Sequence, residues 1–174
     1  MSAAVSVPLR ILCIHGYRQN SGSFRDKTGA LRKLLKKQVE WVYMNAPHSV
    51  PQRTDVVQEQ KEVAKDEEDP RGWWFSDIQA QSFDARQVCG ASLGLEDSLE
   101  AVKKAVRELG PFDGILGFSQ GAALKDGVIP DSLSRDLLPR FQNPQVLTHP
   151  GGHFVPAASV HRQTYQEFLR SFQD

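Results

Sequence analysis

One serine in the chain has the neighbours that a catalytic nucleophile needs. Ser119 lies in Gly117-Phe118-Ser119-Gln120-Gly121, which has the pattern G-x-S-x-G and follows the apolar stretch "FDGIL". In hydrolases with this pattern the serine occupies a sharp, strained turn between a strand and a helix, and the outer residues must be small. The pattern therefore predicts that Ser119 is a nucleophile. The alternative is an incidental glycine-rich turn.

A serine hydroxyl needs a base that takes its proton, and histidine is the usual base at neutral pH. Of the five histidines, His153 in "HPGGHFVP" lies in a glycine-flanked loop after the last predicted strand, and we expect it to be the base. His161 lies on the apolar face of the last predicted helix, where we expect a packing role. His149 and His153 are four residues apart, but Pro150 and two glycines prevent the helix that would aim both at one metal ion. No metal site is predicted.

Two backbone N–H groups are candidates to bind the oxyanion that forms when the serine attacks a carbonyl. His15-Gly16-Tyr17 directly follows the first apolar run, and a turn there presents N–H groups to the reacting oxygen. The N–H of Gln120, the residue after the serine, would be the second donor. The alternative for the first segment is a simple turn at the end of a strand.

The elements that would position these residues alternate between strands and helices. "LRILCIHG" is a nearly continuous apolar run, typical of a strand buried on both faces of a parallel sheet, and "VEWVYMNAP" and "GILGFS" predict two more strands. A helix is expected over 21–37. A second helix, ending at Gly110-Pro111, has an apolar stripe formed by Leu99, Val102, Ala105, Val106 and Leu109.

The rest of the chain completes an α/β order. We expect a helical piece over 134–141, the short strand "QVLTH", and a last helix with an apolar face formed by His161, Tyr165, Phe168, Leu169 and Phe172. The fold class is α/β, with a mostly parallel sheet flanked by helices in a single domain over 1–174. Residues 48–92 lose the pattern and form a long insertion, expected to be a lid or pocket segment.

The composition excludes several other classes of protein. The 174 residues carry 21 Lys and Arg against 21 Asp and Glu, so no excess of positive charge indicates nucleic acid as a partner. No apolar run approaches the ~20 residues of a spanning helix, and the apolar start of the chain is too short for a signal peptide. Cys13 and Cys89 are expected to be free thiols, with Cys13 a buried apolar residue rather than a catalytic group.

Five motifs in order carry a resemblance over nearly the whole chain. They are "LCIHGYRQNSGSFRDKTGALRK", "RGWWFS", "FDGILGFSQGAA", "KDGVIPDS" and "HPGGHFVP". Together they resemble the small α/β-hydrolase esterases of the ovarian-cancer-associated protein 2 type, which are related to the fungal FSH serine hydrolases. The resemblance implies a cytoplasmic or nuclear carboxylic ester hydrolase that needs no cofactor and prefers small-molecule alkyl esters or thioesters with long acyl chains.

The resemblance also implies roles for individual residues. Ser119 would be the nucleophile, His153 the base and Asp126 the acid that orients it. Tyr17 and Gln120 would form the oxyanion hole. Candidates for the substrate pocket or lid are His15, Trp73, Trp74 and Phe75. A purely structural role in the core remains the alternative for each tryptophan and for the phenylalanine.

The chain departs from the family pattern between Leu124 and Lys125. There the nucleophile helix should continue into a strand, a helical region and another strand, so roughly fifty residues and two strands are missing. Asp126 would then directly follow the shortened nucleophile helix instead of a strand of its own. Asp131 and Asp136 are conceivable substitutes for it as the acid. The sequence thus supports an esterase with a Ser-His-Asp mechanism, with an impaired or inactive deletion isoform, at most a binding protein, as the alternative.

Overall fold

Three parallel strands form the central sheet of the protein. The computed structural model describes residues 7–51, 69–77, 79–84, 92–122, 155 and 157–171. Strand β1 (Leu9–Ile14) lies between β2 (Val39–Met44) and β5 (Gly114–Gly117), and both pairings are parallel. The register places Leu12 beside residues 42 and 115. The predicted parallel sheet of an α/β fold is confirmed.

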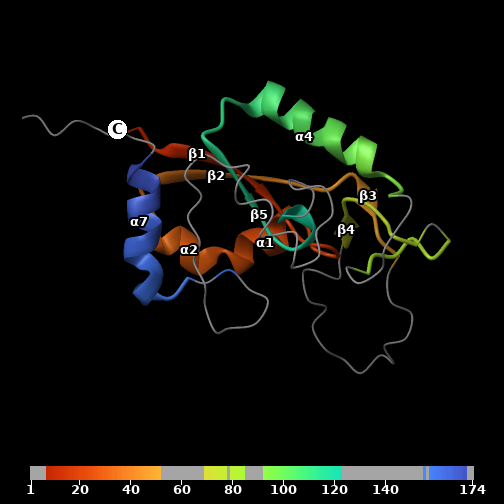
Figure 1. Ribbon diagram of the computed structural model, residues 1–174, viewed down its shortest axis with the longest axis horizontal. Helices are drawn as coiled ribbons and strands as arrows, with labels where there is room; N and C mark the ends of the chain where they lie inside the picture. Colours follow the sequence, from red (N-terminus) through yellow and green to blue (C-terminus); the bar gives the residue numbers. More distant parts are fainter. Residues whose placement is uncertain are drawn as a thin grey trace, which may run out of the picture.

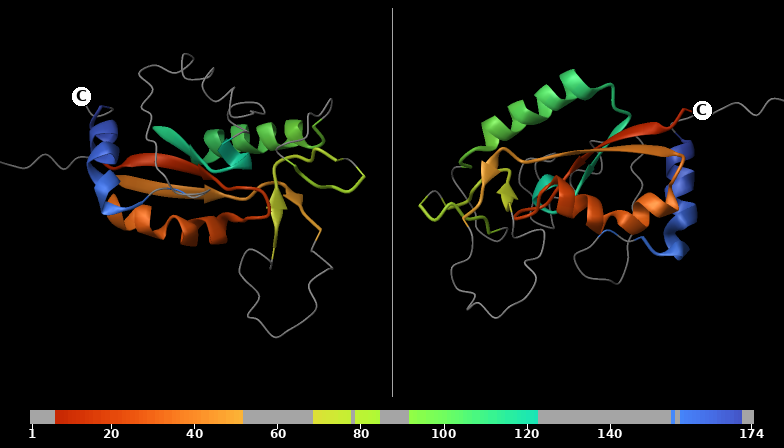
Figure 2. Two further views of the ribbon diagram at one scale, coloured as in Figure 1. Left: turned by 60° about the horizontal axis from the view of Figure 1, so that its bottom comes forward. Right: turned by 180° about the vertical axis from the view of Figure 1, so that it is seen from behind.

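Helices cover both faces of this sheet (Figures 1 and 2). Helices α1 (Ser21–Lys27), α2 (Gly29–Leu34) and α7 (Arg162–Arg170) lie on one face, and α4 (Leu95–Leu109) lies on the other. The apolar cluster on the first face contains Leu31, Leu35 and Val39, with Tyr165 and Leu169 of α7 packed against it. The cluster beneath α4 contains Leu12, Ile14, Ala46, Trp73 and Trp74, with Leu95 and Val102 packed against it. The alternation of side chains along β1 thus supplies both cores.

The helix expected over 21–37 is two short helices with a break at Thr28. The Thr28 hydroxyl donates to the carbonyl of Phe24 at 2.9 Å and lies 2.6 Å from the hydroxyl of Tyr43 on β2. A threonine that bonds back to the preceding turn favours a bend in a helix. Apolar spacing continues through the break, which is why periodicity alone predicted one helix.

Part of the segment expected to be an insertion belongs to the core. Strand β3 (His48–Ser49) pairs antiparallel with β4 (Arg71–Gly72), and the chain after β4 carries Trp73 and Trp74 into the cluster beneath α4. Within 48–92, residues 52–68, 78 and 85–91 lie outside the described residues, and a lid role for the segment stays a prediction.

The described C-terminal segment contains a 3₁₀ turn (η2, Ser159–His161) followed by α7. His161 therefore lies in the turn before the helix rather than within it, whereas Tyr165 and Leu169 pack on the core as expected. The predicted helix over 134–141 and the strand "QVLTH" lie outside the described residues. In the described part of the chain, no helix is long and apolar enough to cross a membrane.

Candidate active site

Ser119 occupies a strained backbone turn directly after β5. Its φ angle is 53°, in the left-handed region that non-glycine residues rarely adopt. The strand ends at Gly117 and a helical turn begins at Gln120, so the chain reverses direction around the serine. Such a conformation costs on the order of 1–3 kcal/mol and persists only where the surroundings hold it in place. The predicted strand-to-helix turn is therefore present.

The two glycines of the motif let this turn approach its neighbours closely. A Cβ atom on Gly121 would lie 2.3 Å from the carbonyl oxygen of Ile14 and 2.4 Å from that of His15. A Cβ atom on Gly117 would lie 2.7 Å from the carbonyl oxygen of Gly121. Because all of these partners are backbone atoms, neither position has room for a side chain, and the turn packs directly on the end of β1.

The loop after β1 lies beside the serine. A Cβ atom built on Gly16 would be 3.1 Å from Cβ of Ser119. The Gln19 side chain fixes this loop, because its Oε1 accepts from the N–H of Gly16 at 2.8 Å, and Arg18 has a left-handed φ of 61°. In the part of the chain that the structure describes, neither the N–H of Tyr17 nor that of Gln120 donates a hydrogen bond. That these two groups bind an oxyanion stays a prediction.

His15 is a buried support of this loop. Its Nε2 accepts from the N–H of Ala46 at 3.0 Å, and its Nδ1 lies 2.7 Å from the carbonyl oxygen of Gly16. An Nε2 that accepts carries no proton, so the imidazole is the Nδ1-protonated tautomer, which donates to that carbonyl. His15 thereby ties the loop to the end of β2. Its predicted place in a substrate pocket stays a prediction.

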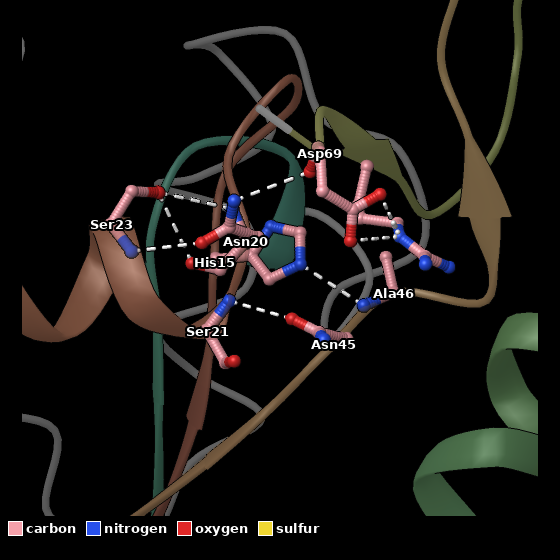
Figure 3. A network of polar contacts seen from close by, with 8 residues as sticks. His15, Asn20, Ser21, Ser23, Asn45, Ala46 and Asp69 are labelled. Atoms are coloured by element: carbon pink, nitrogen blue, oxygen red, sulfur yellow. Dashed lines mark hydrogen bonds and ion pairs between the residues drawn. The ribbon is translucent and has the colours of Figure 1, made fainter. Parts of the chain in front are cut away.

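A polar network fixes the start of α1 beside the same loop (Figure 3). The Asn20 side chain accepts from the N–H of Ser23 at 2.9 Å, and the Ser23 hydroxyl accepts from the N–H of Asn20 at 3.0 Å. Asn45, after β2, accepts from the N–H of Ser21, and the Asn20 amide donates to the carbonyl of Asp69. Our sequence reasoning missed this network, although the spacing N-x-x-S is a recognisable capping signal.

Trp73, Trp74 and Phe75 are buried, with 0%, 2% and 3% of their surfaces exposed. The indole N–H of Trp73 donates to the carbonyl of His15 at 2.8 Å. The ring of Phe83 lies 5.4 Å from that of Trp74 and 5.6 Å from that of Tyr17, measured between centroids. The aromatic segment thus adjoins the loop after β1. Whether it also lines a substrate pocket stays a prediction.

The other predicted catalytic residues follow Ser119 in the chain. Asp126 and His153 lie outside the described residues, as do the conceivable substitutes Asp131 and Asp136.

Cys13 is buried as predicted, and burial raises the pKa of its thiol to about 12, against a smaller opposing effect of its hydrogen bond with Tyr43. A thiol that stays protonated at neutral pH is no nucleophile.

Comparison with known proteins identifies related sequences along the chain. A family model described as serine hydrolase (FSH1) matches residues 4–126 and 124–165. Esterase OVCA2 of Danio rerio is 52% identical over 225 residues, covering 97% of this chain and 99% of that protein. Esterase OVCA2 of Homo sapiens is 36% identical, with 98% and 100% covered, and Esterase CG5412 of Drosophila melanogaster is 30% identical, with 98% and 75% covered.

The same comparisons bear on the predicted junction between Leu124 and Lys125. The two parts of the family match meet at residues 124–126. The alignment with the Danio rerio protein spans 225 positions, 51 more than the 174 residues of this chain. The relative therefore fills at least 51 positions where this chain has no residue. The cytoplasmic or nuclear location stays a prediction.

Proposed function

The chain belongs to the FSH1 serine hydrolase family, a family of ester hydrolases, and on that basis we infer that it cleaves long-chain alkyl esters through an acyl-enzyme on Ser119. One observation carries this proposal. Ser119 is held at a left-handed φ of 53° beside the two N–H groups, of Tyr17 and Gln120, that have no acceptor among the described residues. That combination of a strained serine and available donors is what acyl transfer requires.

In the proposed mechanism, Oγ of Ser119 attacks the ester carbonyl while His153 takes its proton. The tetrahedral oxyanion accepts hydrogen bonds from the two N–H groups, each of which is worth about 10²–10³ in turnover in comparable sites. His153 then protonates the departing alkoxide, and Asp126 orients the imidazole. Water attacks the acyl-enzyme by the reverse sequence and releases the carboxylic acid. The roles of His153 and Asp126 rest on their sequence motifs.

An apolar substrate chain has an aromatic surface near the oxyanion donors. The rings of Tyr17, Phe83 and Trp74 follow one another at centroid distances of 5.6 and 5.4 Å, beginning at the donor residue Tyr17. We propose that the acyl chain lies along the partly exposed rings of Tyr17 and Phe83, with the buried Trp74 packed behind them. Burial of each CH₂ of an acyl chain contributes about 0.8 kcal/mol, so affinity should rise with chain length.

A second function deserves a test because the family match breaks at residues 124–126. Only six residues separate Ser119 from Asp126, so the acid follows the nucleophile without an intervening strand to hold it. Loss of the orienting acid costs about 10⁴ in turnover where it has been measured. A chain impaired in this way would bind esters and turn them over very slowly.

A fluorophosphonate probe distinguishes the two functions, because covalent labelling needs a serine with an assembled base. We expect labelling of the folded chain that Ser119→Ala abolishes, and hydrolysis of p-nitrophenyl esters whose kcat/KM rises with acyl length. Folded, soluble protein that takes up no label would refute the active esterase and leave the impaired form.

A further inference from the structure

The side chain of Gln120 has partners that the proposed mechanism does not use. Its Oε1 accepts from the N–H of Trp73 at 2.9 Å, and its Nε2 donates to the carbonyl of Trp74 at 2.7 Å. The residue is 1% exposed. One carboxamide therefore satisfies two backbone groups of a segment 46 residues away in sequence, and it does so from the residue whose own N–H is an oxyanion donor.

Trp73 connects this carboxamide to the loop that carries the other donor. Its indole N–H donates to the carbonyl of His15 at 2.8 Å, two residues before Tyr17. Its own carbonyl accepts a short hydrogen bond from the buried hydroxyl of Ser98 on α4. The segment is thereby bound at three points: the nucleophile turn, the loop after β1, and α4.

We propose that the Gln120 carboxamide is a positioning residue that sets the separation of the two oxyanion donors by clamping Trp73 between the nucleophile turn and the loop after β1. The inference rests on the proposed function of Ser119 and extends it to a side chain that no motif requires. Oxyanion stabilisation depends on donors held at fixed distance before the reaction begins. A rigid connection between the two donor segments supplies that condition.

The chemistry of the contact requires a group that accepts on one side and donates on the other. A carboxamide does both at every pH, whereas an ionised carboxylate only accepts and would face the Trp74 carbonyl with no proton to offer. Burial raises the pKa of a carboxyl group. The substitution Gln120→Glu therefore breaks the clamp at high pH and restores it, through a donating O–H, when the introduced acid is protonated.

The experiment compares Gln120→Glu with the wild-type chain between pH 5.5 and 8. Two quantities are measured at each pH. They are the rate of Ser119 labelling by a fluorophosphonate, and hydrogen exchange of the backbone amides of residues 16, 18 and 19 and of the indole N–H of Trp73. At pH 8 we expect labelling ~10–10² slower than wild type and faster exchange at these N–H groups. The ratio of variant to wild-type labelling should recover about tenfold toward pH 5.5, although both rates fall as the base protonates.

Two further variants make the test specific. Gln79→Glu adds a carboxylate at an exposed loop position and should leave both quantities and their pH dependence unchanged. Trp73→Phe removes the N–H that donates to His15 while keeping a smaller aromatic ring, and should slow labelling at all pH values without recovery. This variant also tests the clamp if Gln120→Glu fails to fold at pH 8.

Three outcomes overturn the proposal. Labelling of Gln120→Glu within twofold of wild type at pH 8, with faster exchange at residue 73, would make the contact purely structural. Unchanged hydrogen exchange in Gln120→Glu would show that the Gln120 contact does not hold the loop in place. Slow labelling of this variant that does not recover at low pH would show that loss of the two hydrogen bonds is not the cause of the slow labelling. If the wild-type chain itself takes no label, the proposed function fails, and exchange at residues 16, 18 and 19 alone decides the clamp: faster exchange supports it and unchanged exchange refutes it.

Discussion

Replacement of Gly121 by alanine should displace the nucleophile turn from the end of β1. The new Cβ would lie 2.3 Å from the carbonyl oxygen of Ile14 and 2.4 Å from that of His15, about 1 Å inside ordinary van der Waals contact at 3.4 Å. Both partners are backbone atoms of a central strand and its end, so no side chain can rotate away. Overpacking of this kind costs about 1–3 kcal/mol. A turn moved by about 1 Å also costs roughly 10² in rate at the serine.

The assay pairs urea unfolding with fluorophosphonate labelling. Gly29→Ala, at the start of α2, is the matched control, because its Cβ would meet only the end of the Arg32 side chain at 3.8 Å. There the substitution should leave labelling unchanged and add about 0.4–1 kcal/mol to the free energy of unfolding. An ordinary surface substitution changes the free energy of unfolding by no more than about 0.5 kcal/mol. The reasoning is refuted if Gly121→Ala changes the free energy of unfolding by no more than that and is labelled at the wild-type rate.

Three further predictions follow from contacts of the described residues. Burial raises the pKa of the Cys13 thiol to about 12 from an ordinary 9.0, so iodoacetamide at pH 8 should leave Cys13 unmodified in the folded chain and alkylate it in urea. The free energy of unfolding should also fall as pH rises from 9.0 toward 12, because the thiol then ionises only in the unfolded chain. Rapid alkylation of Cys13 in the folded protein would contradict this prediction. Asn20→Ala removes the N-terminal cap of α1 and should lower the free energy of unfolding by about 1 kcal/mol in urea titrations. No change would show that the cap does not contribute to stability. Ser98→Ala leaves the buried carbonyl of Trp73 without its hydroxyl donor and should lower the free energy of unfolding by about 1–3 kcal/mol. A smaller loss of stability than that caused by Asn20→Ala would count against the role of Trp73 in connecting α4 to the nucleophile turn.

The features that sequence predicted best are those set by local pattern. Continuous apolar runs located β1, β2 and β5, and the spacing of small residues around Ser119 located a turn whose strained φ the structure confirms. These signals are local because a buried parallel strand needs apolar residues on both faces, and a sharp turn needs small residues at fixed positions. Neither depends on what the rest of the chain does.

The features that sequence missed depend on contacts between distant segments. The break at Thr28 involves a hydroxyl of β2, and the partners of Gln120 lie 46 and 47 residues away. A core role for the two tryptophans was one of two alternatives left open by the sequence, and the structure places both in the core. No periodicity reports such pairings, because the partner of a side-chain hydrogen bond is fixed only once the fold brings the two segments together.

All the described contacts that build the nucleophile side come from residues before the junction at Leu124. Within the described part of the chain, the hydrogen bonds that join the loop after β1, the tryptophan segment, Ser98 and the turn around Ser119 are made by residues that precede it. The proposed base and acid both follow the junction. We therefore predict that the missing positions affect proton transfer more than the two proposed oxyanion donors. In comparable enzymes an oxyanion hole without an oriented base retains about 10³–10⁴ of rate over water. Slow turnover by this chain would thus be expected to coexist with normal affinity for an oxyanion analogue.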